Sequence, residues 1–199
     1  MIKTTKAVFE VLLVLFAEKE ANLSTIAKRT ELSVMGVSKI VKRLEENKLV
    51  GVTRMGRNSV VRLNKAGENG EVFALAERYR FEKFIESHGR LRGFLVGLRE
   101  RVRERGGFVL LFGSYAAGEE SPQSDLDVLI VSPDGEIASI IKNLAVVVDS
   151  RIAPVTIRTK DFMEQYRKNH RLYREIADGK RILISGEYAF WKMLLALGK

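Results

Sequence analysis

Two aspartates two residues apart, Asp125 and Asp127, have the type and spacing that metal chemistry requires. They adjoin the apolar run Val128–Val131, which is typical of a buried strand. In an extended strand, side chains two residues apart project from the same face, so the two carboxylates should lie close together. Carboxylates so close repel each other unless a cation lies between them, and oxygen ligands of this kind suit Mg²⁺ or Mn²⁺.

A second pattern precedes this pair. The apolar run Phe108–Phe112 is again typical of a buried strand, and it ends in Gly113-Ser114. The glycine lets a phosphate approach the backbone, and the serine offers it a hydroxyl and an N–H. Gly118 and the polar residues 119–124 should then form a flexible loop that delivers the carboxylates. Together the two patterns favour a site for a metal-bound phosphate, and a metal-free structural loop is the alternative.

Gly-Ser, ten residues and then Asp-x-Asp resemble the signature of the polymerase-β-like nucleotidyltransferase superfamily, in its minimal archaeal and bacterial form. The resemblance extends over about residues 106–188, including the stretch 173–179 and a final strand at 181–185. It implies transfer of a nucleoside monophosphate from a nucleoside triphosphate to a hydroxyl with two metal ions. The residues that it implies are Gly113, Ser114 and Ser124 for the nucleotide, and Asp125 and Asp127 as metal ligands and catalytic carboxylates.

The sequence departs from this family at a third carboxylate. In the family that group lies on the strand after the next helix and helps to activate the attacking hydroxyl. Here the helix is predicted over 136–148 and the strand over 154–159, which places the acidic position on Thr156 or Arg158. Neither residue can act as a base or a metal ligand in that role, and Asp149 could substitute only if the chain bends it into the site.

Composition excludes several other chemistries. The chain has 199 residues, no cysteine and two histidines, so disulfide scaffolds, zinc fingers and thiol catalysis are excluded and a histidine-rich metal site is improbable. No apolar run reaches the roughly 18 residues of a membrane span. The first 20 residues resemble a signal peptide superficially, but Glu10 interrupts them and favours an amphipathic helix. We therefore expect a soluble cytoplasmic protein without a membrane partner.

Positive charge is concentrated in one third of the chain. Residues 1–66 hold 13 Lys and Arg against 6 Asp and Glu, whereas residues 67–199 hold 21 against 19, within a total net charge of +9. A polyanionic partner of the first third, nucleic acid above all, is one interpretation. A solvated basic face is the other.

The basic third has the pattern of a helix-turn-helix. Apolar spacing predicts helices over 6–17, 25–30 and 34–47, with Ser33 as the N-cap of the last. Strands are expected over 49–54 and 59–63 around a turn at 55–58. Residues 1–66 thus resemble the winged helix-turn-helix domains of bacterial and archaeal regulators, with Leu23–Thr30 as the support helix and Ser33–Glu46 as the recognition helix.

That resemblance implies double-stranded DNA as a partner. The side chains implied to meet base edges are Ser33, Met35, Ser38 and Lys39, and those implied to meet phosphates are Lys42, Arg43, Arg54 and Arg57. A winged helix that serves only protein–protein contact is the alternative.

The middle of the chain predicts a helical connector. After a loop at 67–70, apolar stripes favour two helices separated by Ser87-His88-Gly89, and we assign His88 no chemistry. The stripes suit an intramolecular core or the seam of a homodimer. We expect an α+β protein: a winged helix-turn-helix domain at 1–66, a helical connector at 67–105, and a nucleotidyltransferase-like mixed β-sheet flanked by helices at 106–199.

Two functions follow from these patterns. The first is a DNA-binding regulator of transcription whose nucleotidyltransferase-like domain binds a metal–nucleoside triphosphate, with transfer activity weak or lost. The second is an active Mg²⁺-dependent nucleotidyltransferase that modifies a nucleic acid or a toxin-like protein. The missing third carboxylate favours the first and the Asp125/Asp127 pair the second, so the sequence leaves open whether the chain is an enzyme.

Overall fold

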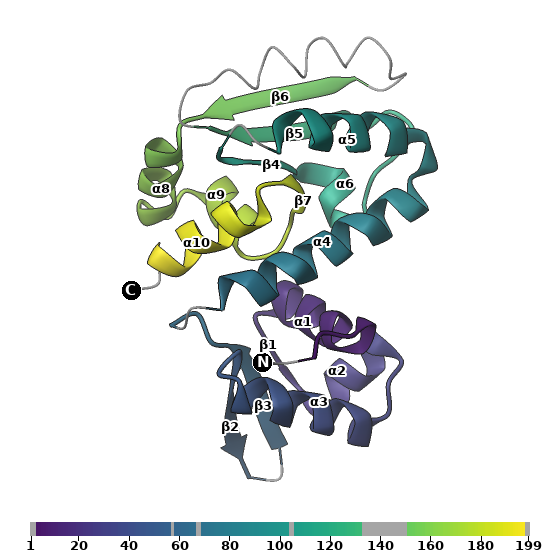
Figure 1. The fold of residues 1–199 in the computed structure, drawn as a ribbon, viewed down its shortest axis with the longest axis vertical. Coiled ribbons are helices and arrows are strands. Elements are labelled where there is room, and N and C mark those ends of the chain that lie inside the picture. Colours follow the sequence, from purple (N-terminus) through teal and green to yellow (C-terminus); the bar gives the residue numbers. More distant parts are fainter. Residues whose placement is uncertain (1–2, 57, 67–68, 104–105, 133–150, 198–199) are drawn as a thin grey trace.

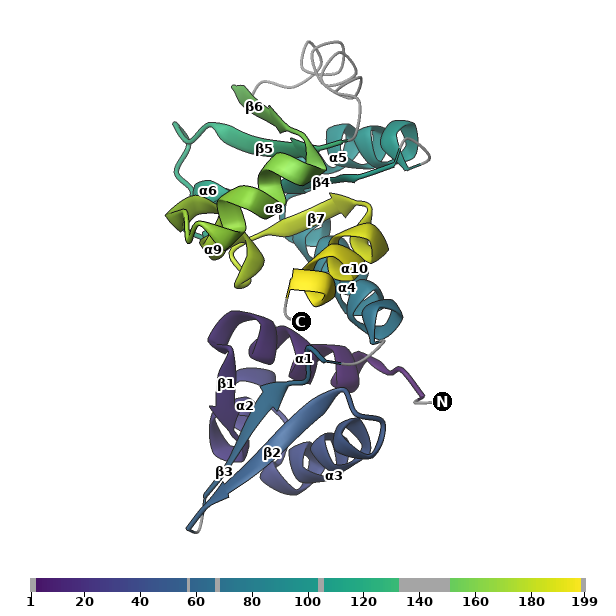
Figure 2. The same ribbon diagram turned by 90° about the vertical axis from the view of Figure 1, so that its left-hand side faces the viewer.

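The structure, a computed structural model, describes residues 3–56, 58–66, 69–103, 106–132 and 151–197. Its elements form two units stacked along the long axis of the molecule, with helix α4 running from one to the other (Figure 1). One unit contains a three-stranded sheet and the other a four-stranded sheet with helices against both faces (Figures 1 and 2). The chain therefore has the α+β fold class that the sequence predicts.

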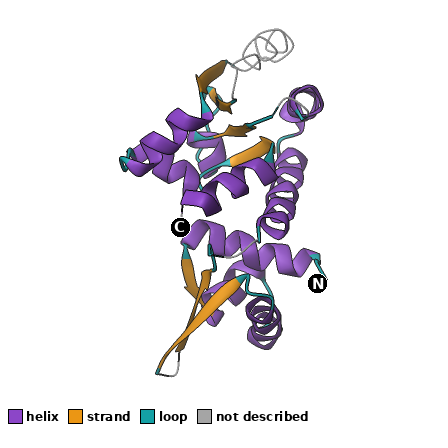
Figure 3. Cartoon of the chain, turned by 60° about the vertical axis from the view of Figure 1, so that its left-hand side comes forward, coloured by secondary structure: helices purple, strands orange, loops and turns teal. Residues whose placement is uncertain are grey.

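The N-terminal unit has the predicted order of helices followed by a β-hairpin. Its elements are α1 (Lys6–Glu18), β1 (Glu20–Asn22), α2 (Leu23–Thr30), α3 (Val34–Glu46), β2 (Val50–Met55) and β3 (Asn58–Leu63). The hairpin of β2 and β3 projects from the end of the molecule (Figure 3). Strand β1, which pairs with β3 in the order β1-β3-β2, was not predicted, because three residues are too few to reveal alternation.

Side-chain caps set the starts of the helices in this unit. The Asn22 side chain accepts a hydrogen bond from the Thr25 N–H at 2.7 Å, and α2 begins at the next residue. Ser33 Oγ accepts from the Gly36 N–H at 3.1 Å, which confirms the predicted N-cap of α3. The inward residues of α3 are buried as their spacing predicts, namely Val37, Val41 and Leu44.

The C-terminal unit is built on a mixed sheet of order β6-β5-β4-β7. Its elements are β4 (Phe108–Leu111), α6 (Gly113–Ala117), β5 (Leu126–Val131), β6 (Ile152–Ile157), α8 (Thr159–Arg167), α9 (Arg171–Ala177), β7 (Ile182–Ser185) and α10 (Glu187–Leu197). Strands β5 and β6 are parallel and the other pairs are antiparallel, so the predicted mixed sheet is confirmed. The helix predicted over 136–148 and Asp149 lie outside the described residues.

Alternate residues of β5 belong to two apolar cores. Val128 and Ile130 lie in the core that contains the buried face of α5, whereas Leu129 and Val131 lie in the core that contains Phe162 of α8. Because side chains alternate between the faces of a sheet, Asp127 projects on the side of Leu129. On this face of the sheet, Leu129 is buried by apolar side chains, whereas Asp127 is only half-buried.

The two predicted connector helices are α4 (Gly70–Ser87) and α5 (Gly89–Val102), and they meet at His88 as expected. Helix α4 contacts α1 of the N-terminal unit and also α10 and β7 of the C-terminal unit. One apolar core is continuous from Leu12 through Phe73 to Trp191, so the units share buried surface. The boundaries at 66 and 105 stay a prediction. Within the described residues, no helix has the length and apolarity needed to cross a membrane.

A buried ion pair fixes the C-terminal unit to α4. The Arg181 side chain is 1% exposed, and its guanidinium donates to the Glu77 carboxylate and to the Ile176 carbonyl at 2.9 Å. Its guanidinium carbon also lies 4.3 Å from the centroid of the Phe190 ring. Burial lowers the pKa of Arg181 to about 10 and the Glu77 charge opposes that shift, so the guanidinium stays charged at neutral pH.

Helix α1 contacts the C-terminal unit close to this ion pair, at the residues just before Arg181. Lys19 Nζ lies 2.8 Å from Asp178 Oδ2. Gly179 has a φ of +121°, and a Cβ at this position would lie 2.1 Å from the Phe16 carbonyl oxygen. A residue with a side chain therefore does not fit where α1 meets the C-terminal unit.

We predict that Glu77→Gln lowers the free energy of unfolding by about 3–5 kcal/mol, because it leaves a buried guanidinium without its counter-charge. The matched control is Glu164→Gln, which removes an exposed pair with Lys168 and should leave stability unchanged. Urea denaturation of both variants measures the difference. Equal midpoints for the two would contradict a structural role of the buried pair.

Candidate nucleotide and metal site

The two halves of the Gly-Ser and Asp-x-Asp pattern meet at the end of β4. The Phe112 N–H donates to the Asp127 carbonyl at 3.1 Å, which holds the chain after β4 against β5. Gly113 follows with a φ of +68°, and a Cβ here would lie 2.1 Å from Asp127 Oδ2. Glycine is thus required both by the backbone conformation and by the approach of the carboxylate.

The electrostatics of the two aspartates suit a bound cation. Asp127 is half-buried and Asp125 is exposed. Burial, followed by the charge of Asp125, raises the pKa of Asp127 above its usual range. A divalent cation would offset both effects, and two carboxylates beside an open backbone match the donor preference of Mg²⁺ or Mn²⁺. The residues present therefore fit such an ion.

Hydrogen bonds tie the start of the loop from Gly118 to Ser124 to the helix before it and close a turn at the end of the loop. The Glu119 N–H donates to the Ser114 carbonyl at 3.0 Å. Ser124 Oγ accepts from the Ser121 N–H at 2.9 Å, so this hydroxyl belongs to a turn just before Asp125. Ser114 and Ser124 are both half-buried near the two ends of the loop.

The register of β6 corrects the expected position of the third carboxylate. Asp127 pairs with Ala153, whereas Thr156 pairs with Ile130, whose side chain lies on the other face of the sheet. Arg158 lies beyond the end of β6. The prediction that Thr156 or Arg158 occupies the acidic position was wrong, because the strand starts two residues earlier than its sequence suggests.

No acid replaces the missing one on that side of β6. The residues that share the face of Asp127 are Ala153, Val155 and Ile157 of β6 and Arg151 just before it. In the described ranges, which omit 133–150 among others, no group of three His, Cys, Asp or Glu residues could hold a metal ion. A site with two carboxylates is what the described residues form.

The residues expected to face DNA are at the surface of the N-terminal unit. Those on α3 and its N-cap are all exposed, namely Ser33, Met35, Ser38, Lys39, Lys42 and Arg43, as is Arg54 on β2. Met35 is 70% exposed, which is unusual for a large apolar side chain. Arg57 lies outside the described residues.

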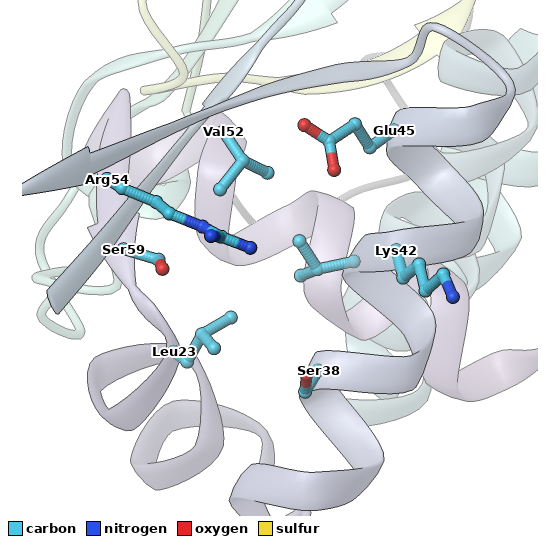
Figure 4. A pocket seen from close by; sticks show the side chains of 8 residues that line it. Leu23, Ser38, Lys42, Glu45, Val52, Arg54 and Ser59 are labelled. Atoms are coloured by element: carbon cyan, nitrogen blue, oxygen red, sulfur yellow. The ribbon is translucent and has the colours of Figure 1, made fainter. Parts of the chain in front are cut away.

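A groove of about 390 Å³ separates α3 from the hairpin. Three of the predicted side chains line it: Ser38 and Lys42 from α3, and Arg54, which extends from β2 toward the helix (Figure 4). Glu45 and Ser59 line it as well and were not predicted. Glu45 could have been found from its helical spacing, since it is seven residues after Ser38 and shares its face of α3.

Comparison with known proteins identifies the C-terminal unit. Residues 91–183 match the family model of the nucleotidyltransferase domain, and the matched range contains the glycine–serine and aspartate patterns. The chain therefore contains a nucleotidyltransferase domain. No curated protein matches the chain.

Among solved structures, the chain is similar to one reported as "Structure of TrmBL2, an archaeal chromatin protein, shows a novel mode of DNA binding". The identity is 15%, the match covers 89% of this chain and 71% of that chain, and the TM-score is 0.31. A TM-score of this size is too low to relate the two folds.

We predict that Gly113→Ala weakens Mn²⁺ binding by roughly tenfold or more, because its methyl group displaces the Asp127 carboxylate. Gly118→Ala is the matched control: Gly118 has nearly the same φ, +71°, but no atom lies within 4 Å of a Cβ built there. Both variants bear the backbone strain, and only Gly113→Ala has the clash. Titration of Mn²⁺ by electron paramagnetic resonance separates them, and equal affinities would contradict the metal site.

Proposed function

We propose that this protein is a DNA-binding regulator of transcription whose nucleotidyltransferase domain binds a metal–nucleoside triphosphate, with transfer activity weak or lost. One observation carries the second half of this proposal. On the described part of β6, none of the residues on the face of Asp127 (Ala153, Val155 and Ile157) is acidic, whereas the resemblance implies a third carboxylate on this strand that helps to activate the attacking hydroxyl.

Nucleotide binding needs fewer groups than transfer. Asp125 and Asp127 would hold Mg²⁺, and the ion would supply charge neutralisation for the triphosphate. Gly113 is exposed and lacks a side chain, so the phosphates could approach the backbone beside Ser114. Ser124, in the turn before Asp125, would add a polar contact.

An acid introduced on β6 opposite Asp127 tests the proposal directly. We predict that Ala153→Asp increases the transfer of label from a nucleoside triphosphate to components of a cell extract in the presence of Mg²⁺ or Mn²⁺. Ala153→Asn has nearly the same shape without the charge and should leave transfer at the wild-type level. The expected gain is at least about tenfold, within the range that a positioned general base contributes.

The alternative function is an active nucleotidyltransferase that modifies a nucleic acid or a toxin-like protein. The intact Asp125/Asp127 pair is the observation in its favour. Vigorous transfer by the wild-type protein that is lost in an Asp125→Ala/Asp127→Ala variant would establish this alternative and overturn the proposal.

The DNA-binding half of the proposal is supported by charge and exposure. Residues 1–66 carry a net charge of +7, from 13 basic and 6 acidic residues. With α3 in a major groove, Ser33, Met35, Ser38 and Lys39 would face base edges. Lys42, Arg43, Arg54 and Arg57 would contact phosphates. A homodimer would read two half-sites, and a monomer in sedimentation at micromolar concentration would exclude that arrangement.

We predict that Lys39→Ala/Lys42→Ala weakens binding to duplex DNA through both residues and reduces the slope of log K against log salt by about 1, since the lost phosphate contact of Lys42 releases about one counterion fewer. Lys160→Ala/Lys180→Ala removes the same charge from exposed positions of the C-terminal unit and serves as control. Fluorescence anisotropy over a salt series measures both. Equal slopes for the two double variants would remove duplex DNA from the proposal.

A further inference from the structure

We propose that His88 and Glu120 form an ionic clamp that orders the loop before Asp125 and Asp127, and that loss of the imidazolium proton opens this clamp. The clamp rests on the proposed function in one respect, because the loop matters only if the two aspartates hold a metal–nucleotide. His88 is then a positioning residue that reaches the site from the joint between α4 and α5.

The contact joins segments far apart in the sequence. His88 Nε2 lies 2.9 Å from Glu120 Oε1, and both side chains are mostly buried, at 22% and 27% exposure. The imidazole is stacked on Phe84 with ring centroids 4.0 Å apart. It also meets the Tyr115 ring edge-on at 6.0 Å. These contacts hold the ring so that Nε2 faces the loop.

Both ring nitrogens of His88 face hydrogen-bond acceptors. His88 Nδ1 lies 2.9 Å from the Phe84 carbonyl oxygen, and Nε2 faces a carboxylate oxygen. Both partners only accept hydrogen bonds, whereas a neutral imidazole has a single N–H to donate. Imidazolium alone satisfies both contacts. Ser87 Oγ, 2.9 Å from Nδ1, could donate to an unprotonated nitrogen, but its one proton also has the Phe84 carbonyl as an acceptor at 3.0 Å.

The negative charge of Glu120 is stabilised by His88. The hydrogen bond from His88 is the main reason that the pKa of Glu120 lies below its usual range. Its second carboxylate oxygen, Oε2, is buried without a hydrogen-bond partner in the part of the chain that the structure describes. Within the same residues, the ionisable side chains in contact with His88 are Glu120 from the loop and Tyr115 from α6. Loss of the imidazolium proton would therefore leave a carboxylate poorly compensated.

The clamp is connected both to the Gly113-Ser114 segment and to the loop before Asp125 and Asp127. Glu120 lies between Glu119, whose N–H is bonded to the Ser114 carbonyl, and the Ser121–Ser124 turn that leads to Asp125. Tyr115, against the imidazole, is the residue after Ser114. One imidazole thus contacts the helix that follows Gly113 and the loop that delivers the carboxylates. Opening of the contact would loosen the loop and weaken metal binding.

Amide hydrogen exchange of the full-length protein tests the clamp without any ligand. After correction for intrinsic exchange rates, protection of the hydrogen-bonded amides of Glu119, Ser121 and Ser124 should fall by about fivefold between pH 6 and pH 8.5, the upper size of a partly exposed ion pair. Glu120→Gln and His88→Gln should both show low protection at either pH. Glu119→Gln, an equal charge change at an exposed neighbouring position, should keep the wild-type pH dependence.

Wild-type pH dependence in Glu120→Gln, or its loss in Glu119→Gln, would overturn the clamp. Mn²⁺ titration at the same two pH values separates this result from the proposed function. If the clamp positions the aspartates, wild-type affinity falls with protection as the pH rises and the affinity of Glu120→Gln stays constant. Loss of protection at high pH in a wild-type protein that binds no Mn²⁺ at either pH would overturn the metal–nucleotide site and leave the clamp intact.

Discussion

At the end of β4, the backbone of Gly113 lies so close to Asp127 that a Cβ there would be 2.1 Å from a carboxylate oxygen. This approach makes a metal–phosphate site possible, because it puts an open main chain beside a half-buried carboxylate. The pairing of β4 with β5 places Gly113 there, and the loop that begins at Gly118 places Asp125 beside Asp127. The Asp125/Asp127 pair lies within the matched nucleotidyltransferase domain, whereas the described residues of β6 on the same face include no acid.

The rest of the fold connects this site to the basic unit. Helix α4 packs against α1 at one end and against β7 and α10 further along, and the buried Glu77–Arg181 pair fixes it to the sheet. At its C-terminal end the same helix leads into His88, which contacts the loop of the site. Helix α4 therefore connects the N-terminal unit to the candidate nucleotide site. A regulator that couples DNA to a nucleotide would need a rigid connection of this kind.

Local patterns predicted most of the fold. The cap at Ser33, the break at His88 and the apolar runs before Gly113 and after Asp125 depend on neighbouring residues, and each is present. Register and long-range pairing could not be read from one sequence. We expected the third acidic position at the wrong residues because the start of β6 depends on its pairing with β5. Proline is uncommon inside a strand, so Pro154 gave no indication that the strand begins at Ile152. Contacts such as His88–Glu120 join residues 32 apart in the sequence, and no spacing rule predicts them.

Under the proposed function, the domain binds a metal–nucleoside triphosphate and does not consume it. The most direct test is to incubate the protein with labelled nucleoside triphosphates and Mg²⁺, isolate the protein-bound fraction, and identify the bound nucleotide by chromatography. The account predicts Mg²⁺-dependent binding, lost in an Asp125→Asn/Asp127→Asn variant, with the triphosphate recovered unchanged. Release of pyrophosphate with the monophosphate attached to an acceptor, or no binding in the wild type, would contradict it.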